Sequence, residues 1–152
     1  MIPERVQHLF REAVLKTCIQ GRRSMSEHGG CAYLAPNGDS CLVGHALPPA
    51  LLAEVGSNTS HVRAMADEVP EVGKWLGTAG EGYFGAVNTL WSQGQKCHDL
   101  DVDYPDADPE YRRPFGVSWS AWFWYRARTL AKASGFDIGN YPRHEVRDAQ
   151  AA

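Results

Sequence analysis

Apolar residues near the start of the chain recur every three or four positions, which predicts a helix over residues 3–20. Pro3 suits the first turn of this helix, and Gly21 suits a left-handed stop at its end. The face expected to be buried carries Val6, Leu9, Phe10, Ala13, Val14, Thr17 and Cys18. The stretch that follows has no periodicity, and we expect a loop there.

The pattern changes over residues 31–45, where two short apolar runs flank Asn37-Gly38. An Asn-Gly pair favours a tight hairpin turn, because both residues tolerate positive φ. The sequence therefore predicts a small antiparallel β-hairpin with Gly38 in its turn. Since an isolated hairpin is only marginally stable in water, it must pack against helices or find a third strand.

Helical patterns return further along the chain, over residues 50–55, about 61–69, 82–98 and 119–134. Residues 77–82 are glycine-rich and predict a turn that matches no phosphate-binding motif. The expected apolar stripe of 82–98 is Phe84, Val87, Leu90, Trp91 and His98, and that of 119–134 includes Trp119, Trp122, Phe123, Ala127 and Leu130. The tail from about 136 should be loosely ordered.

The predicted fold is α+β: one helix-rich domain over residues 1–152 with a small hairpin.

Composition narrows the class of protein. The chain has 152 residues, 43% of them hydrophobic, with a formal net charge of −3. This charge disfavours nucleic acid as a partner, because the basic field that phosphates require is absent. No apolar run reaches the length of a membrane span, and no signal segment is visible at the start. We expect a cytoplasmic chain without a membrane partner, whose four cysteines are thiols.

One group of residues resembles a signature of small uncharacterised phage and prophage proteins. It consists of Cys31-Ala32-Tyr33, Gly38, Cys41-Leu42-Val43-Gly44 and Leu47-Pro48, followed later by Gln95-Lys96-Cys97-His98-Asp99. The chain departs from the signature at Leu34, His45 and Gly94, where the pattern has Arg, often Cys, and Leu. The resemblance implies a mobile-element origin and a place in the host cell, and it implies no reaction.

The cysteines and histidines raise two chemical hypotheses. A zinc site would draw on Cys31, Cys41, His45, Cys97 and His98, of which Cys31, Cys41 and His45 share a sheet face only if the hairpin turn has three residues. A nucleophilic site would combine His98, with Asp99, and Cys31 or Cys41 across the fold. Neither spacing is typical of such sites, so we expect no metal and no cofactor, and we favour a binding role over catalysis while the enzyme stays an open alternative. The simpler interpretation of His98 is that it ends an apolar stripe near a helix C-terminus.

The acidic segment that follows has the ligand spacing of a calcium loop. Asp99, Asp101, Asp103 and Glu110 occupy positions 1, 3, 5 and 12 of an EF-hand. Position 6 requires glycine for a sharp turn, and here it is Tyr104. We therefore interpret the segment as a solvated acidic loop that could dock a cation or a basic partner.

The last helix carries the candidate partner surface. Trp124, Tyr125 and Arg128 lie off its apolar stripe, so we expect them to be exposed and to contact a partner or a second copy of the chain. The favoured function is a phage- or prophage-derived binding protein that acts on a host protein or a small ligand, with interference in host defence as one such role. The alternatives are an enzyme built on His98 and a thiol, with or without a metal, and a structural subunit of an oligomer.

Overall fold

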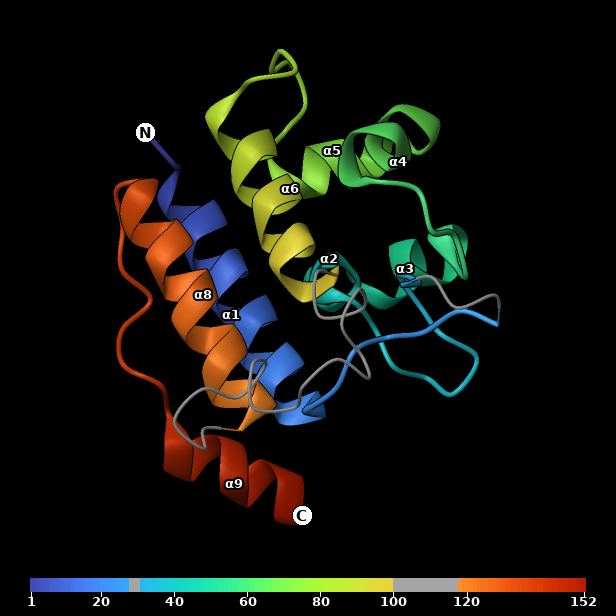
Figure 1. Cartoon of the computed structure of the whole chain (residues 1–152). Coiled ribbons are helices and arrows are strands. Elements are labelled where there is room, and N and C mark those ends of the chain that lie inside the picture. Colours follow the sequence, from blue (N-terminus) through green and yellow to red (C-terminus); the bar gives the residue numbers. More distant parts are fainter. Residues whose placement is uncertain (28–30, 100–117) are drawn as a thin grey trace.

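The structure is a computed structural model that describes residues 1–27, 31–99 and 118–152. Its elements are all helices, α1 (Glu4–Gln20), α2 (Leu42–Ala46), α3 (Pro49–Val55), α4 (Val62–Glu68), α5 (Pro70–Leu76), α6 (Ala86–Asp99), α8 (Trp119–Ala133) and α9 (Arg143–Ala151) (Figure 1). These three ranges contain no β-strand. The predicted α+β class is therefore wrong, and the described chain is all-α.

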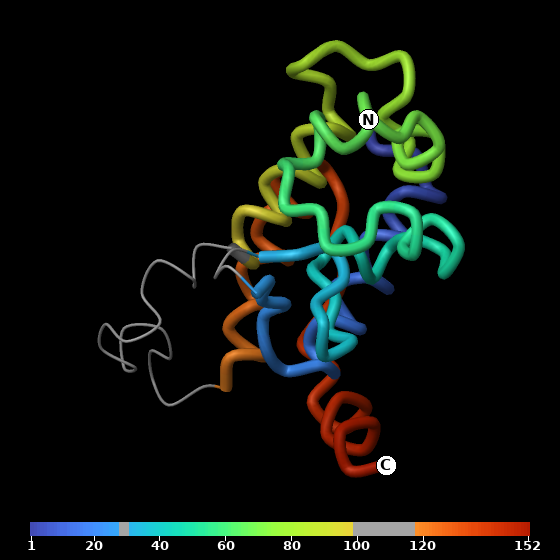
Figure 2. The backbone as a smooth tube through the Cα atoms, turned by 90° about the vertical axis from the view of Figure 1, so that its right-hand side faces the viewer, coloured from blue at the N-terminus to red at the C-terminus, as the bar shows by residue number. Residues whose placement is uncertain are grey.

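Helix α1 is the central element and matches the sequence prediction. It begins directly after Pro3 and ends at Gly21, whose φ is +74° and whose N–H donates to the Thr17 carbonyl. Helices α2, α8 and α9 all contact it. Figures 1 and 2 show α1 and α8 side by side, with the two termini at opposite ends of the molecule.

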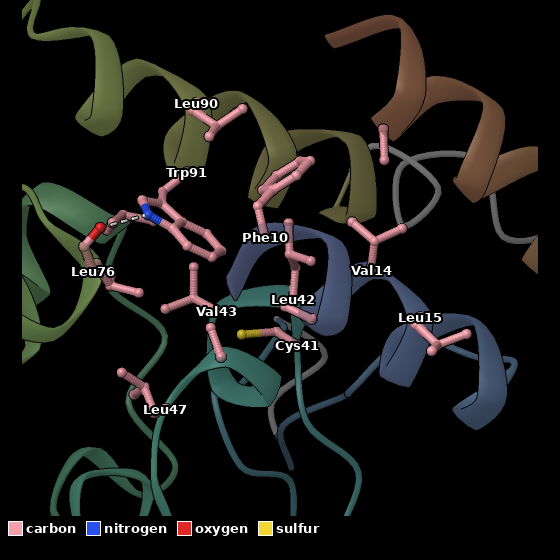
Figure 3. Packing of buried hydrophobic residues seen from close by; sticks show 14 of the residues in the cluster. Phe10, Val14, Leu15, Cys41, Leu42, Val43, Leu47, Leu76, Leu90 and Trp91 are labelled. Carbon is pink, nitrogen blue, oxygen red and sulfur yellow. Dashed lines mark hydrogen bonds between the residues drawn. The ribbon is translucent and has the colours of Figure 1, made fainter. Parts of the chain in front are cut away.

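The core lies where α1, α2 and α6 meet (Figure 3). The Phe10 ring packs edge-on against the Trp91 indole, with 5.5 Å between their centroids. Leu42 and Val43 of the short helix α2 are fully buried beside them. The Trp91 indole N–H is not left unsatisfied, because it donates to the Leu76 carbonyl at 2.9 Å.

Helix α8 also follows its predicted pattern over most of its length. Ser118 caps it by accepting a hydrogen bond from the Ala121 N–H at 3.1 Å. The helix contacts both α1 and α6. Phe123 and Ala127 are fully buried, whereas Trp122 and Leu130 of the predicted stripe are only half-buried.

The predicted hairpin is replaced by a tight turn and a helix. Leu34 and Ser40 form a single antiparallel bridge, and Gly38 has the positive φ expected of it, +89°. The chain then enters α2, where the Cys41 thiol sulfur accepts a hydrogen bond from the Gly44 N–H at 3.3 Å. A short apolar run such as 41–44 fits a buried helix as well as a strand, so its pattern could not distinguish them.

The first half of the predicted hairpin pairs with a different segment. The Tyr33 and Leu34 N–H groups donate to the Asn58 and Gly56 carbonyls at 3.2 and 3.0 Å. The Tyr33 hydroxyl donates to the Ser60 carbonyl at 2.7 Å. These bonds hold residues 31–35 against the segment that leads into α4.

Besides α2, two further helices were absent from the sequence prediction. Helix α5 begins at Pro70, which suits the first turn of a helix as well as the end of one. Helix α9 lies in the tail that was expected to be loosely ordered, and its Val146 is buried while the helix contacts α1. In the described part of the chain, no helix is both long enough and apolar enough to cross a membrane.

Candidate functional site

A pocket of about 500 Å³ opens between α4, α6 and the segment that contains the two predicted hairpin cysteines. Most of its lining is polar and uncharged. The described lining residues are Cys31, Tyr33, Cys41, Thr59, Ser60, His61, Val62, Arg63, Tyr83, Phe84, Asn88, Thr89, Ser92, Gln93, Gln95 and Lys96. The bonds from Tyr33 to residues 58 and 60 hold one wall of this pocket in place.

Two exposed aromatic rings stand at the mouth of the pocket. Tyr83 and Phe84 both line it, yet they are 65% and 89% exposed. Their rings meet edge-to-face, with centroids 5.0 Å apart and planes at 82°. Large apolar side chains exposed beside a cavity are typical of a binding surface.

The turn that carries these rings is held by a carboxylate. Glu81 accepts hydrogen bonds from the Val87 and Asn88 N–H groups at 3.1 and 2.7 Å, which caps the first turn of α6. Phe84 was predicted to belong to the buried stripe of this helix, and that prediction is wrong. Helix α6 begins only at Ala86, so Phe84 precedes the helix instead of lying on its inner face.

Asn88 contributes a buried acceptor to the pocket wall. Its side chain is almost fully buried, and its Nδ2 donates to the Tyr83 carbonyl at 2.9 Å. No donor among the described residues lies within hydrogen-bond distance of its Oδ1. A buried acceptor in this state costs ~1–3 kcal/mol of free energy, which a ligand that donates a proton can recover.

The charged groups of the pocket are basic. Arg63 and Lys96 line it together with His61, and the described lining contains no Asp or Glu. Arg63 forms an exposed ion pair with Asp67 at 3.5 Å, so part of its charge is balanced by a carboxylate outside the described lining. No ion pair to Lys96 is found within the described residues. The described lining of the pocket thus carries Arg63 and Lys96 and no carboxylate, on a chain of net charge −3.

The structure brings together only part of the predicted catalytic set. Cys31 and Cys41 both line the pocket. His98 does not belong to the described lining, because it is fully buried in the last turn of α6. Its ring meets the Trp119 and Phe123 rings edge-on, each with centroids 6.1 Å away. His98 thus occupies an aromatic core position.

The described residues form neither a metal-binding cluster nor a cysteine–histidine pair that includes His98 in the pocket lining. Among the described residues, no cluster of three or more His, Cys, Asp or Glu side chains could hold a metal ion. Asp99 is the last residue of α6, and the remainder of the predicted acidic loop lies outside the described residues. The buried Cys18 thiol donates to the Ser120 carbonyl, and burial raises its pKa, which keeps it protonated.

The predicted partner surface on α8 is not present as a patch. Trp124 was expected to be exposed, and this is wrong: its exposed fraction is 0%. Tyr125 is exposed, at 51%. Arg128 is half-buried and bound to Asp137 and Asn140 by hydrogen bonds of 2.8–3.1 Å. Only one of the three side chains is therefore available to a partner in the isolated chain.

Apart from Cys31 and Cys41, the residues that line the pocket were not predicted as site residues from the sequence. The available signal was the pair Tyr83-Phe84 enclosed by glycines on both sides, since a helix interior rarely holds glycines at such density. Arg63 and Lys96 lie on different helices, and no sequence spacing connects them. No family model, curated protein or solved structure matches this chain.

Proposed function

We propose that this chain is a non-enzymatic binding protein that holds a small ligand in the pocket between α4 and α6. The observation that carries the proposal is the pocket itself, which combines about 500 Å³ of space with two exposed aromatic rings at its mouth. Sites for small molecules typically have ~300–1,000 Å³, apolar contact area and a few placed polar groups. The Glu81 cap supports it further, because rings held in place before binding lose little entropy on binding.

The distribution of chemistry in the fold favours binding over catalysis. A catalytic His98 would need a thiol and a concave site within hydrogen-bond reach. Instead, the pocket cysteines lie on a wall whose described residues do not include His98. The proposal also favours a small ligand over a host protein, because burial of Trp124 leaves no continuous aromatic patch on α8.

The proposed setting is a host cell that carries a phage or prophage. Its support is the resemblance of the segment from Cys31 to Pro48 to small phage and prophage proteins. Several of the residues that carry the resemblance have packing roles. Cys41 caps α2, Val43 is buried, and Gly44 leaves room for the Tyr33 carbonyl.

The test is a fragment screen by amide NMR on the full chain. A library of small aromatic and polar fragments should shift the amide signals of Thr89, Ser92 and Gln93, which line the pocket on α6. A Ser92→Trp variant should fill the pocket and abolish these shifts. A matched Ala133→Trp variant, at an exposed position of α8 outside the pocket lining, should keep them.

Each result of the screen has a defined meaning. A dispersed spectrum shows that a variant is folded, and Thr89→Trp provides a second pocket-filling change if Ser92→Trp does not fold. The proposal is wrong if fragments bind without shifting these amides, or if the pocket-filling variants bind as the unmodified chain does.

A further inference from the structure

We infer that the ligand of this pocket is a single nucleotide, a planar base joined to a phosphate group. The inference rests on the proposed function and adds the chemical class of the ligand. Three features of the pocket point to the same molecule: the aromatic rings at the mouth, the two cations of the described lining and the buried acceptor of Asn88.

The aromatic rings select a flat, unsaturated group. Because Tyr83 and Phe84 meet edge-to-face, the edge of one ring covers one face of the other, and the pair leaves the remaining ring faces uncovered by each other. Phe84 is 89% exposed, which leaves a large apolar surface in water. A nucleobase stacks on such a ring whatever its sequence identity, because every base has a π-face.

The two basic side chains of the pocket lining, Arg63 and Lys96, favour a ligand with one small anionic group. Arg63 and Lys96 line the same pocket, and the described lining supplies no carboxylate to neutralise them. A guanidinium and an ammonium together match the charge and the acceptor oxygens of one phosphate. A longer nucleic acid is disfavoured, because a chain with net charge −3 lacks the basic track that successive phosphates require.

The buried amide explains why a base fits better than a plain aromatic acid. Asn88 Nδ2 is already bound to the Tyr83 carbonyl, so the group that remains for a ligand is the acceptor Oδ1. A base supplies the missing donor through a ring N–H or an exocyclic amino group.

The experiment is a calorimetric titration of the full chain at low salt. The probes are the four ribonucleoside monophosphates, their nucleosides, inorganic phosphate and a deoxythymidine decamer. At least one monophosphate should bind about tenfold or more tightly than both its nucleoside and inorganic phosphate, since a charge-assisted contact is added to stacking.

Matched variants separate the two parts of the ligand. Phe84→Ala should weaken the monophosphate by about fivefold to a hundredfold through loss of stacking. Tyr125→Ala removes an exposed aromatic ring outside the pocket and should change nothing. Lys96→Gln and Arg63→Gln should weaken the monophosphate and leave the nucleoside unaffected, whereas Lys16→Gln, at an exposed site on α1, should leave both unaffected.

The outcomes distinguish this inference from the proposed function. If fragments bind in the pocket but no monophosphate exceeds its nucleoside and inorganic phosphate, the nucleotide inference is wrong and the binding function stands. If neither fragments nor nucleotides bind there, both are wrong. Binding of the decamer more tightly than any monophosphate would overturn the free nucleotide as the source and assign the pocket to single-stranded nucleic acid.

Discussion

Trp124 on α8 and Phe84 before α6 exchange the roles that their sequence patterns predict. Trp124 lies off the apolar stripe of its helix and is nevertheless fully buried, while Phe84 continues an apolar stripe and is 89% exposed. The difference has a physical cause in each case. Helical periodicity describes one element, whereas burial depends on which other segments reach that element and on where the helix begins.

The cover over Trp124 comes from the segment between α8 and α9. Its indole N–H donates to the Gly139 carbonyl at 2.9 Å, and the Tyr141 ring lies 6.2 Å away. The Arg11 guanidinium of α1 lies over the same indole at 5.7 Å. Phe84 meets the Tyr83 ring and is otherwise largely exposed, because it precedes the start of α6 at Ala86.

The largest expected effect is that of Trp124→Ala on stability. Removing this fully buried indole should lower the free energy of unfolding by ~3–5 kcal/mol, because it leaves a cavity under residues 139–141. Tyr125→Ala, the neighbouring exposed change, should stay within ~0.5 kcal/mol. Urea unfolding of both variants measures the difference, and equal values would mean that α8 is not covered at Trp124.

The sequence predicted those parts of the fold that depend on local signals. Pro3 and Gly21 bound α1, and Ser118 caps α8, as their residue types indicate. The prediction failed where the structure of a segment depends on contacts with residues far away in the sequence. Residues 31–35 found their hydrogen-bond partners at 56–60, and the pocket collects Arg63 and Lys96 from two helices. No local pattern contains that information.

The lowered pKa of His45, a residue of α2, predicts that the stability of the fold depends on pH. Burial, with His98 and Lys16 nearby, lowers the pKa of His45 to about 4 against the opposing charge of Asp39. Between pH 6.5 and 4 the unfolded chain therefore binds a proton that the folded chain does not, so stability falls as pH falls through this window. The loss should be about 1–3 kcal/mol, given that His45 is only partly buried.

The control for this prediction is His45→Gln, which can still bond to the Gln20 carboxamide that His45 contacts at 2.9 Å. Denaturation at a series of pH values should show a flatter profile for the variant between pH 6.5 and 4. Identical slopes in the two proteins would show that His45 is not held neutral by the fold.

A smaller effect is expected at Gly44, where the core meets the pocket wall. A Cβ at this position would overlap the Tyr33 carbonyl oxygen. Gly44→Ala should therefore destabilise the fold by ~1–3 kcal/mol, since backbone must shift to make room. Gly82→Ala, where no atom lies within 4 Å of the added carbon, should change the unfolding midpoint little. A neutral Gly44→Ala would contradict the close approach of Tyr33 to α2.

The most direct test of the account measures stability and ligand affinity together in two variants, Phe84→Ala and Trp124→Phe. Phe84→Ala should leave the free energy of unfolding within ~0.5 kcal/mol of that of the unmodified chain. The same change should weaken the binding of pocket ligands at least about fivefold. Trp124→Phe should lower stability and leave affinity unchanged, because the indole belongs to the core and not to the pocket lining. If Phe84→Ala lowers stability without changing affinity, or Trp124→Phe weakens binding while remaining folded, the division between a structural core and a binding turn is wrong.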